Sequence, residues 1–313
     1  MRFISCQLLS DNKRKFVNIN PVDAFFWTFR RNENDVINLY DALSSLMQIS
    51  TGSNMLNFGY WNEKTSDPYE AQIMLCKTIT DMAELKSSND ILDVGSGFSE
   101  PATIWKSEFP HIKISCLNVN PQQLYFASRI IKGNGVTCNQ SNSGSDHIRL
   151  VNSTATRLPF ANKSMDRIIA LESAQHFKPF SEFISESKRV LREKGILVLA
   201  IPTLTKSARS LGVFKLGILS FTWSSEHYDL ESIKNTIIDE GFDVTITERI
   251  GSKVYEPLAD YYVKNREILR PKILEQYSSY VEKILFRSLL KMKEVSENKT
   301  IDYILLKAVK STL

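Results

Sequence analysis

The chain has 313 residues, of which 24% are charged and 42% are apolar, and its formal net charge is +4. That length allows one large α/β domain with appendages or two small domains, and the composition is ordinary for a globular protein. The small basic excess argues against a dedicated nucleic-acid-binding protein, in which lysine and arginine would be clustered in larger numbers.

The cysteines and the apolar runs restrict the cellular setting. Four cysteines lie far apart and form no Cys-x-x-Cys pair: Cys6, Cys76, Cys116 and Cys138. We therefore expect no zinc site and no disulfide framework, and a cytoplasmic location. The N-terminal apolar run is too short for a signal peptide. The longest apolar stretch, 211–223, is interrupted by Lys215 and is too short to cross a bilayer.

The first part of the chain indicates a helical cap. Within residues 1–55, the segment 36–47 carries apolar side chains at helical spacing. A dense aromatic loop, Asn-Phe-Gly-Tyr-Trp, follows at 57–61. The next helix is well marked, because Asp67 can cap it and Pro68 occupies its first position.

The segment 90–101, Asp-Ile-Leu-Asp-Val-Gly-Ser-Gly-Phe-Ser-Glu-Pro, is the centre of the predicted fold. It combines a short buried strand with Gly95 and Gly97, where the backbone can turn sharply and a ligand can approach closely. Asp93 is a carboxylate inside the strand end, where a purely structural strand would carry an apolar residue. A helix should follow at 102–108, with its positive end directed at the turn.

Strands and helices alternate through the rest of the chain. Further strands are expected at 112–119, 148–152, 167–171, 196–201, 242–247 and 301–309. Helices are expected after the caps Asn120 and Asp229, at 179–192, and over the long segment 261–293. The segment 133–147 is expected to be a polar surface loop. This alternation predicts a parallel sheet with helices on both faces and a ligand crevice at the carboxyl ends of its strands.

Two cofactors compete for the glycine turn. A dinucleotide fingerprint would need a third glycine at position 100, where Glu100 stands. S-adenosylmethionine (SAM) is a sulfonium cation without a phosphate. Asp93, the acidic strand residue that begins the Asp-x-Gly-x-Gly turn, suits its methionine part. At this turn the chain resembles the class I SAM-dependent methyltransferases.

The resemblance covers about residues 56–310 and is strongest to small-molecule enzymes, the sugar and natural-product O-methyltransferases and the sterol and tocopherol C-methyltransferases. It implies an α/β fold with a seven-stranded, mostly parallel, doubly wound sheet. It also implies an N-terminal helical cap (1–55) and a methyltransferase domain (56–313) with lid segments at about 204–228 and 255–298.

The resemblance implies SAM as the cofactor and S-adenosylhomocysteine as its product. The implied cofactor-binding residues come from six segments: Tyr60, Trp61, Gln72, Asp93, Gly95, Gly97, Asn118, Val119, Gln123, Thr154, Ala155 and Glu172. For Tyr60 and Trp61 a cation–π contact with the sulfonium competes with plain packing. For Gln123 the alternative is a solvated helix residue, and for Glu172 it is a strand-end carboxylate in water.

Three positions around the implied cofactor site depart from the family pattern, namely Ser99, Asn118 and Thr154. Most family members carry Asp or Glu in place of Asn118, to accept both ribose hydroxyls, whereas an amide can both accept and donate. They usually carry Asp in place of Thr154, to meet the adenine amine. These departures leave open a non-catalytic methyltransferase-like scaffold that binds a protein partner.

The expected reaction is an in-line methyl transfer to a small, partly apolar acceptor, for which alignment and exclusion of water matter most. A hydroxyl acceptor must also lose a proton, and His176, just after the fourth strand, is the candidate general base. Alternatively His176 packs or caps a helix start, and His227 is a weaker candidate. C- or N-methylation remains open. No metal site, no nucleic-acid partner and a possible homodimer are expected.

Overall fold

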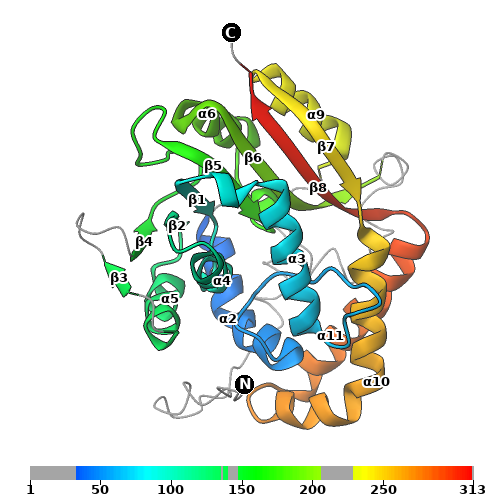
Figure 1. Cartoon of the computed structure of the whole chain (residues 1–313). Helices are drawn as coiled ribbons and strands as arrows, with labels where there is room; N and C mark the ends of the chain where they lie inside the picture. Colours follow the sequence, from blue (N-terminus) through cyan, green and yellow to red (C-terminus); the bar gives the residue numbers. More distant parts are fainter. Residues whose placement is uncertain (1–32, 135–136, 140–146, 206–227, 312–313) are drawn as a thin grey trace.

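The computed structural model describes residues 33–134, 137–139, 147–205 and 228–311. Its centre is one sheet whose eight described strands run in the order β3-β4-β2-β1-β5-β6-β8-β7 (Figure 1). The strands are β1 (Asp90–Val94), β2 (Lys113–Asn118), β3 (Thr137–Asn139), β4 (His147–Asn152), β5 (Met165–Leu171), β6 (Leu191–Leu204), β7 (Phe242–Arg249) and β8 (Ile301–Lys310).

The sheet is mostly parallel. All neighbouring strands from β3 to β6 pair in parallel, whereas β8 is antiparallel to both β6 and β7. The predicted α/β class, with a mostly parallel doubly wound sheet, is confirmed. The described sheet has one strand more than the seven expected, because the segment 133–147, expected to be only a loop, contains the short edge strand β3.

Helices cover both faces of the sheet. They are α2 (Glu33–Thr51), α3 (Pro68–Met82), α4 (Glu100–Glu108), α5 (Pro121–Gly133), α6 (Phe180–Val190), α9 (Leu230–Asp239), α10 (Tyr255–Leu274) and α11 (Ser279–Glu297). Successive strand residues face opposite sides, so Ile91 joins one apolar core with α3, α4, α10 and α11. Its neighbour Leu92 joins the other core with α6 and α9. Two cores on one sheet are what a doubly wound fold requires.

Three predicted helix caps are present. The side chain of Asp67 accepts a hydrogen bond from the backbone N–H of Glu70, at 2.9 Å. Asn120 accepts from two backbone N–H groups at the start of α5, and Asp229 accepts from the backbone N–H of Ser232 in α9. These caps satisfy backbone donors that the first helical turn leaves free.

Two expected boundaries are wrong. The long helix expected at 261–293 is two helices, because Ser278 starts α11 by accepting a hydrogen bond from the backbone N–H of Val281. The helix expected to end at 192 ends at Val190, since Leu191 already pairs with Met165 in the sheet. The apolar stretch 211–223, expected to be part of a lid, lies outside the described residues. Among the described helices, none combines the length and apolar character that crossing a bilayer requires.

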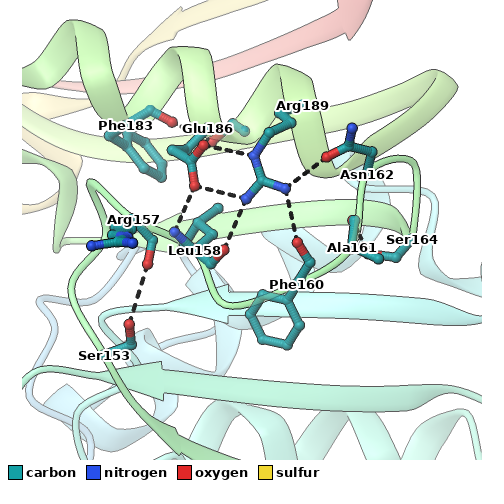
Figure 2. A network of polar contacts seen from close by, with 11 residues as sticks. Ser153, Arg157, Leu158, Phe160, Ala161, Asn162, Ser164, Phe183, Glu186 and Arg189 are labelled. Carbon is teal, nitrogen blue, oxygen red and sulfur yellow. Dashed lines mark hydrogen bonds and ion pairs between the residues drawn. The ribbon is translucent and has the colours of Figure 1, made fainter.

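A polar network holds the loop between β4 and β5 (Figure 2). The Arg189 guanidinium donates two hydrogen bonds to the carboxylate of Glu186, at 2.7 and 2.8 Å. It also donates to the carbonyl oxygens of Leu158 and Phe160, both at 2.8 Å, and to the side chain of Asn162. Glu186 in turn accepts from the backbone N–H of Leu158, at 2.7 Å. One ion pair on α6 therefore fixes a loop that has no regular structure of its own.

We expect Arg189→Met to lower the free energy of unfolding by roughly 1–3 kcal/mol, because it leaves the carbonyl oxygens of that loop without their donor. Urea unfolding of the purified variant measures this change. The matched control is Lys163→Met, which removes the exposed ion pair of Lys163 with Glu193. That pair should contribute no more than about 1 kcal/mol. Equal effects of the two substitutions would contradict the role of Arg189.

Candidate functional site

A cleft opens at the carboxyl ends of β1, β2, β4 and β5, where the parallel register brings four loops to one edge of the sheet. It encloses roughly 940 Å³ of space between protein atoms, with open solvent at its mouth included. Helix α2 forms another wall through Glu33, Val36, Ile37 and Tyr40. This space is what we call the cleft below.

Of the predicted site residues, nine line the cleft. They are Asp93, Gly95, Gly97, Asn118, Val119, Gln123, Ala155, Glu172 and His176. Segments that are far apart in the chain therefore meet around one space, as the sequence predicts. Whether each residue touches a cofactor stays a prediction.

The glycine turn shapes the floor of the cleft. Gly95 has φ = 75° and Gly97 has φ = 54°, both in the left-handed region that favours glycine. A β-carbon on Gly95 would lie 2.3 Å from Cβ of Ser173, so this position has no room for one. On Gly97 the nearest atom would be Cδ1 of Leu56, at 3.6 Å, which is an ordinary van der Waals contact and no collision.

Ser99 also has a positive φ, 57°, and is completely buried. Its hydroxyl donates to the hydroxyl of Ser96 at 3.0 Å. At this departure from the family pattern, a hydrogen bond inside the turn accompanies the unusual backbone conformation.

The two glycines should respond differently to alanine. We expect Gly97→Ala to cost roughly 1–2 kcal/mol, from left-handed backbone strain alone. Gly95→Ala should cost several kcal/mol, because the same strain is added to a collision with Ser173. Thermal or urea unfolding compares the two variants, and a smaller loss for Gly95→Ala would show that the turn is built differently.

Asp93 brings a carboxylate into the floor of the cleft with only 3% of its surface exposed. Burial raises the pKa of this carboxyl group to about 7. Within the described part of the chain, no hydrogen bond or ion pair reaches its carboxylate to offset that burial. A buried carboxylate without a partner favours a cationic ligand, which would stabilise its charged form.

Glu172 carries a second carboxylate into the lining of the cleft just after β5, and the residue is half-buried. Its Oε1 accepts hydrogen bonds from the backbone N–H of Phe58 and from the hydroxyl of Tyr303, both at 2.7 Å. Burial raises its pKa to about 8, although these two bonds favour the charged form. Glu172 therefore ties the aromatic loop to the sheet through hydrogen bonds of its side chain.

The pKa of Asp93 predicts how the stability of the ligand-free protein depends on pH. In the unfolded chain an aspartate loses its proton near pH 4, whereas folded Asp93 keeps it to about pH 7. The folded state binds more protons in that window, so the free energy of unfolding should fall as the pH rises from 4 to 7. For this residue we expect a loss on the order of 1–3 kcal/mol.

Urea unfolding at pH 5, 6, 7 and 8 measures this loss in the wild-type protein and in Asp93→Asn. The variant carries no titrating group at this position, so its curve should be flatter between pH 5 and 7. Parallel curves for the two proteins would show that Asp93 is ionised throughout.

The second strand end is an amide network. The Asn118 side chain donates to the carbonyl of Gly97 at 3.2 Å and to Oε1 of Gln123 at 2.8 Å. Its Oδ1 accepts from the backbone N–H of Asn120 at 3.0 Å. The Nε2 atom of Gln123 is buried and has no hydrogen-bond partner in the described residues. A buried donor without a partner on the lining of a cleft is a candidate ligand contact.

His176 lies at the end of the short 3₁₀ helix η4 (Ala174–His176), on the wall of the cleft. Its Nε2 is 3.2 Å from the hydroxyl oxygen of Tyr40, and the two rings meet edge to face with centroids 5.7 Å apart. Nε2 is also 3.4 Å from the side-chain nitrogen of Gln175. The histidine therefore has a defined position between the sheet edge and α2.

Four predicted cofactor residues are not on the lining of the cleft. Tyr60 accepts a hydrogen bond from Lys253, and Trp61 is 8% exposed and packs against Tyr261. Gln72 is buried and donates to the carbonyl oxygens of Met55 and Asn57, which explains its place under the aromatic loop. Thr154 donates to the carboxylate of Glu33 and lies beside the lining residues Ser153 and Ala155.

Sequence reasoning missed the contribution of α2. The segment 36–47 was expected only to cap the domain, although its helical apolar spacing was visible. The expected lid segments remain predictions, and in the described part of the chain α10 and α11 contribute no lining residue. No group of three or more metal-binding side chains converges among the described residues.

Comparison with known proteins gives these observations a context. Residues 92–199 match the family model described as a methyltransferase domain. The erythromycin 3''-O-methyltransferase of Saccharopolyspora erythraea is 25% identical over 246 residues, which are 76% of this chain and 78% of that protein. The 27-O-demethylrifamycin SV methyltransferase of Amycolatopsis mediterranei is 28% identical over 57% of this chain and 62% of its own length.

Solved structures show the same fold. The crystal structure of the [4+2]-cyclase SpnF has a TM-score of 0.72, with 18% identity, and the match covers 90% of this chain and 98% of that one. Other solved structures of this fold carry SAM or S-adenosylhomocysteine by their titles. The expected resemblance to small-molecule methyltransferases is confirmed, and with it the prediction of a SAM-dependent methyltransferase.

Proposed function

Because residues 92–199 match the methyltransferase domain, we propose that this protein transfers a methyl group from SAM to a hydroxyl group of a small, partly apolar molecule. The observation that carries the proposal is that one cleft is lined both by Asp93, a buried carboxylate with no partner among the described residues, and by His176. One group suits a cationic methyl donor, and the other can accept a proton.

The residues present fit SAM. Among the described residues no cation lies beside the carboxylate of Asp93, and the ammonium of the methionine part would provide one. In the same part of the chain Gln123 Nε2 has no acceptor, and the nucleoside part would provide one. Gly97 lines the cleft and carries no side chain, so a ligand can lie close to the backbone there. SAM would supply a methyl group already activated on its sulfonium.

The contribution of the protein is then to position the acceptor, exclude water and remove one proton. The neutral imidazole of His176 can accept a hydrogen bond at Nε2 when its proton is on Nδ1. An acceptor hydroxyl that reaches Nε2 in the same way would give up its proton as the new bond to the methyl carbon forms. The acceptor hydroxyl would take the place of the Tyr40 hydroxyl at Nε2, while the edge-to-face contact of the two rings keeps the imidazole in position.

The choice of oxygen as acceptor has two supports. His176 is a base that an oxygen acceptor needs, and two relatives are named as O-methyltransferases or as acting on an O-demethylated compound. C-methylation, N-methylation and a non-catalytic scaffold are the alternatives. The likeness to a cyclase also illustrates that the fold alone does not set the reaction.

Calorimetric titration with SAM and with S-adenosylhomocysteine is the first test, on the wild-type protein and on Asp93→Ala. Saturable binding that the substitution abolishes supports the methyl-donor assignment. Absence of binding in the wild-type protein overturns it. Release of S-adenosylhomocysteine with a panel of macrolide, ansamycin, amine and alkene acceptors then separates O-, N- and C-methylation.

With an oxygen acceptor from that panel, we expect His176→Ala to lower kcat by roughly 10²–10⁴-fold, because the general base is lost. The dissociation constant for S-adenosylhomocysteine should stay within a few-fold of the wild-type value. The control is His111→Ala, since His111 is exposed and packs only edge-on against Phe109. Full turnover in His176→Ala would remove the base from the proposal.

A further inference from the structure

One carboxylate reaches the cleft from outside the sheet. Glu33 is the first residue of α2 and lines the cleft. Its Oε1 accepts a hydrogen bond from the hydroxyl of Thr154, in the loop after β4. The neighbours of Thr154 in that loop, Ser153 and Ala155, line the cleft as well.

The side-chain amide of Asn118, at the end of β2, already forms hydrogen bonds within the protein. Both hydrogens of the Asn118 amide go to other groups of the protein, the carbonyl of Gly97 and the side chain of Gln123. One lone pair of its Oδ1 goes to the backbone of Asn120. Asn118 therefore braces the glycine turn and the start of α5, and little of its hydrogen-bonding capacity remains for a ligand.

Thr154 orients Glu33. A threonine hydroxyl has one hydrogen to donate, and here the carboxylate of Glu33 accepts it. The hydroxyl oxygen of Thr154 also accepts a hydrogen bond from the backbone N–H of Thr156, at 3.3 Å, and this bond fixes the Thr154 side chain. A carboxylate has about four lone-pair sites, so several remain for donors of a ligand beside it.

We propose that Glu33 is a cofactor-binding residue, whose carboxylate accepts a hydrogen bond from an N–H or O–H group of the nucleoside part of the methyl donor. This rests on the proposed function. Hydrogen bonds to a carboxylate are stronger than those between neutral groups, so Glu33 takes over a task that Asn118 and Thr154 cannot perform as neutral side chains. The acidic function has moved from the sheet to α2.

The assignment gives α2 a second role. On the same helix, Asp41 accepts a hydrogen bond from the Asn120 side chain at 2.8 Å, and Tyr40 contacts His176. A methyl donor held by Glu33 would therefore bridge α2 to the sheet edge. Binding of the donor would then favour the helix position in which Tyr40 meets the proposed base.

The test is the binding of two ligands to Glu33→Gln, measured by calorimetry. S-adenosylhomocysteine contains both parts of the methyl donor, whereas 5′-methylthioadenosine lacks the amino-acid part. We expect the dissociation constants of both to rise about tenfold, since a charge-assisted bond is lost at the nucleoside end. Asp93→Asn, at the other end, should weaken S-adenosylhomocysteine and leave 5′-methylthioadenosine within twofold.

Two further variants control for indirect effects. Asp35→Asn removes the other acidic group from the first turn of α2 without touching the cleft lining, so binding should stay within twofold. Thr154→Asp in the Glu33→Gln background returns a carboxylate to the same contact and should restore binding to within threefold. S-inosylhomocysteine, which lacks the adenine amine, identifies the group that Glu33 contacts. If Glu33→Gln does not change its dissociation constant, the contact is to the amine. If the substitution raises that constant about tenfold, the contact is to a ribose hydroxyl.

The outcomes separate the two proposals. A wild-type protein that binds no S-adenosylhomocysteine overturns the proposed function and this inference together. Wild-type binding with unchanged affinity in Glu33→Gln overturns only this inference. An equal loss in Asp35→Asn and Glu33→Gln also overturns it, because the effect would then come from the charge of the helix end.

Discussion

The burial of the Asp93 carboxylate is the constraint on which the site depends. A parallel strand buried on both faces normally carries apolar residues throughout. Here a residue with only 3% of its surface exposed holds an ionisable group at the point where four loops meet. Burying this carboxylate lowers the stability of the ligand-free protein, and a bound cationic ligand would offset that loss. Strain and unpaired polarity at one place in an otherwise consistent fold are typical of functional sites.

The surroundings of Asp93 keep that cost local. The glycine turn that follows it is fixed by the backbone bond from Gly95 to the Leu117 carbonyl and by the Asn118 amide. The Glu172 carboxylate accepts hydrogen bonds from the backbone N–H of Phe58 and the hydroxyl of Tyr303, and these bonds join the aromatic loop to the last strand. Farther from the cleft, the Glu186–Arg189 pair holds the loop that continues from Thr154 and Ala155 (Figure 2). Each loop of the cleft therefore has its own anchor in the sheet or in a helix packed on it.

The sequence predicts the parts of this protein that depend on local chemistry. Short apolar runs, turn glycines and capping side chains such as Asp67 and Asn120 leave direct traces in the order of residues, so the sheet and most helices could be located. The floor of the cleft could be predicted for the same reason, because Asp93, Gly95 and Gly97 are neighbours in one motif. Boundaries that depend on competition, such as the change from α6 to β6 at Leu191, could not, since strand pairing outweighs the continuing helical pattern.

What the sequence could not supply is the pairing of distant side chains. Glu33 and Thr154 are 121 positions apart, and Tyr40 and His176 are 136 positions apart. No periodicity relates them, because their contacts exist only once α2 has docked on the sheet edge. The departures at Asn118 and Thr154 read as losses when each position is considered alone. Under the proposed role of Glu33, the acidic group lies on α2 instead of on the strand edge. The neutral strand edge and the acidic helix would then together present the polar groups that a nucleoside requires.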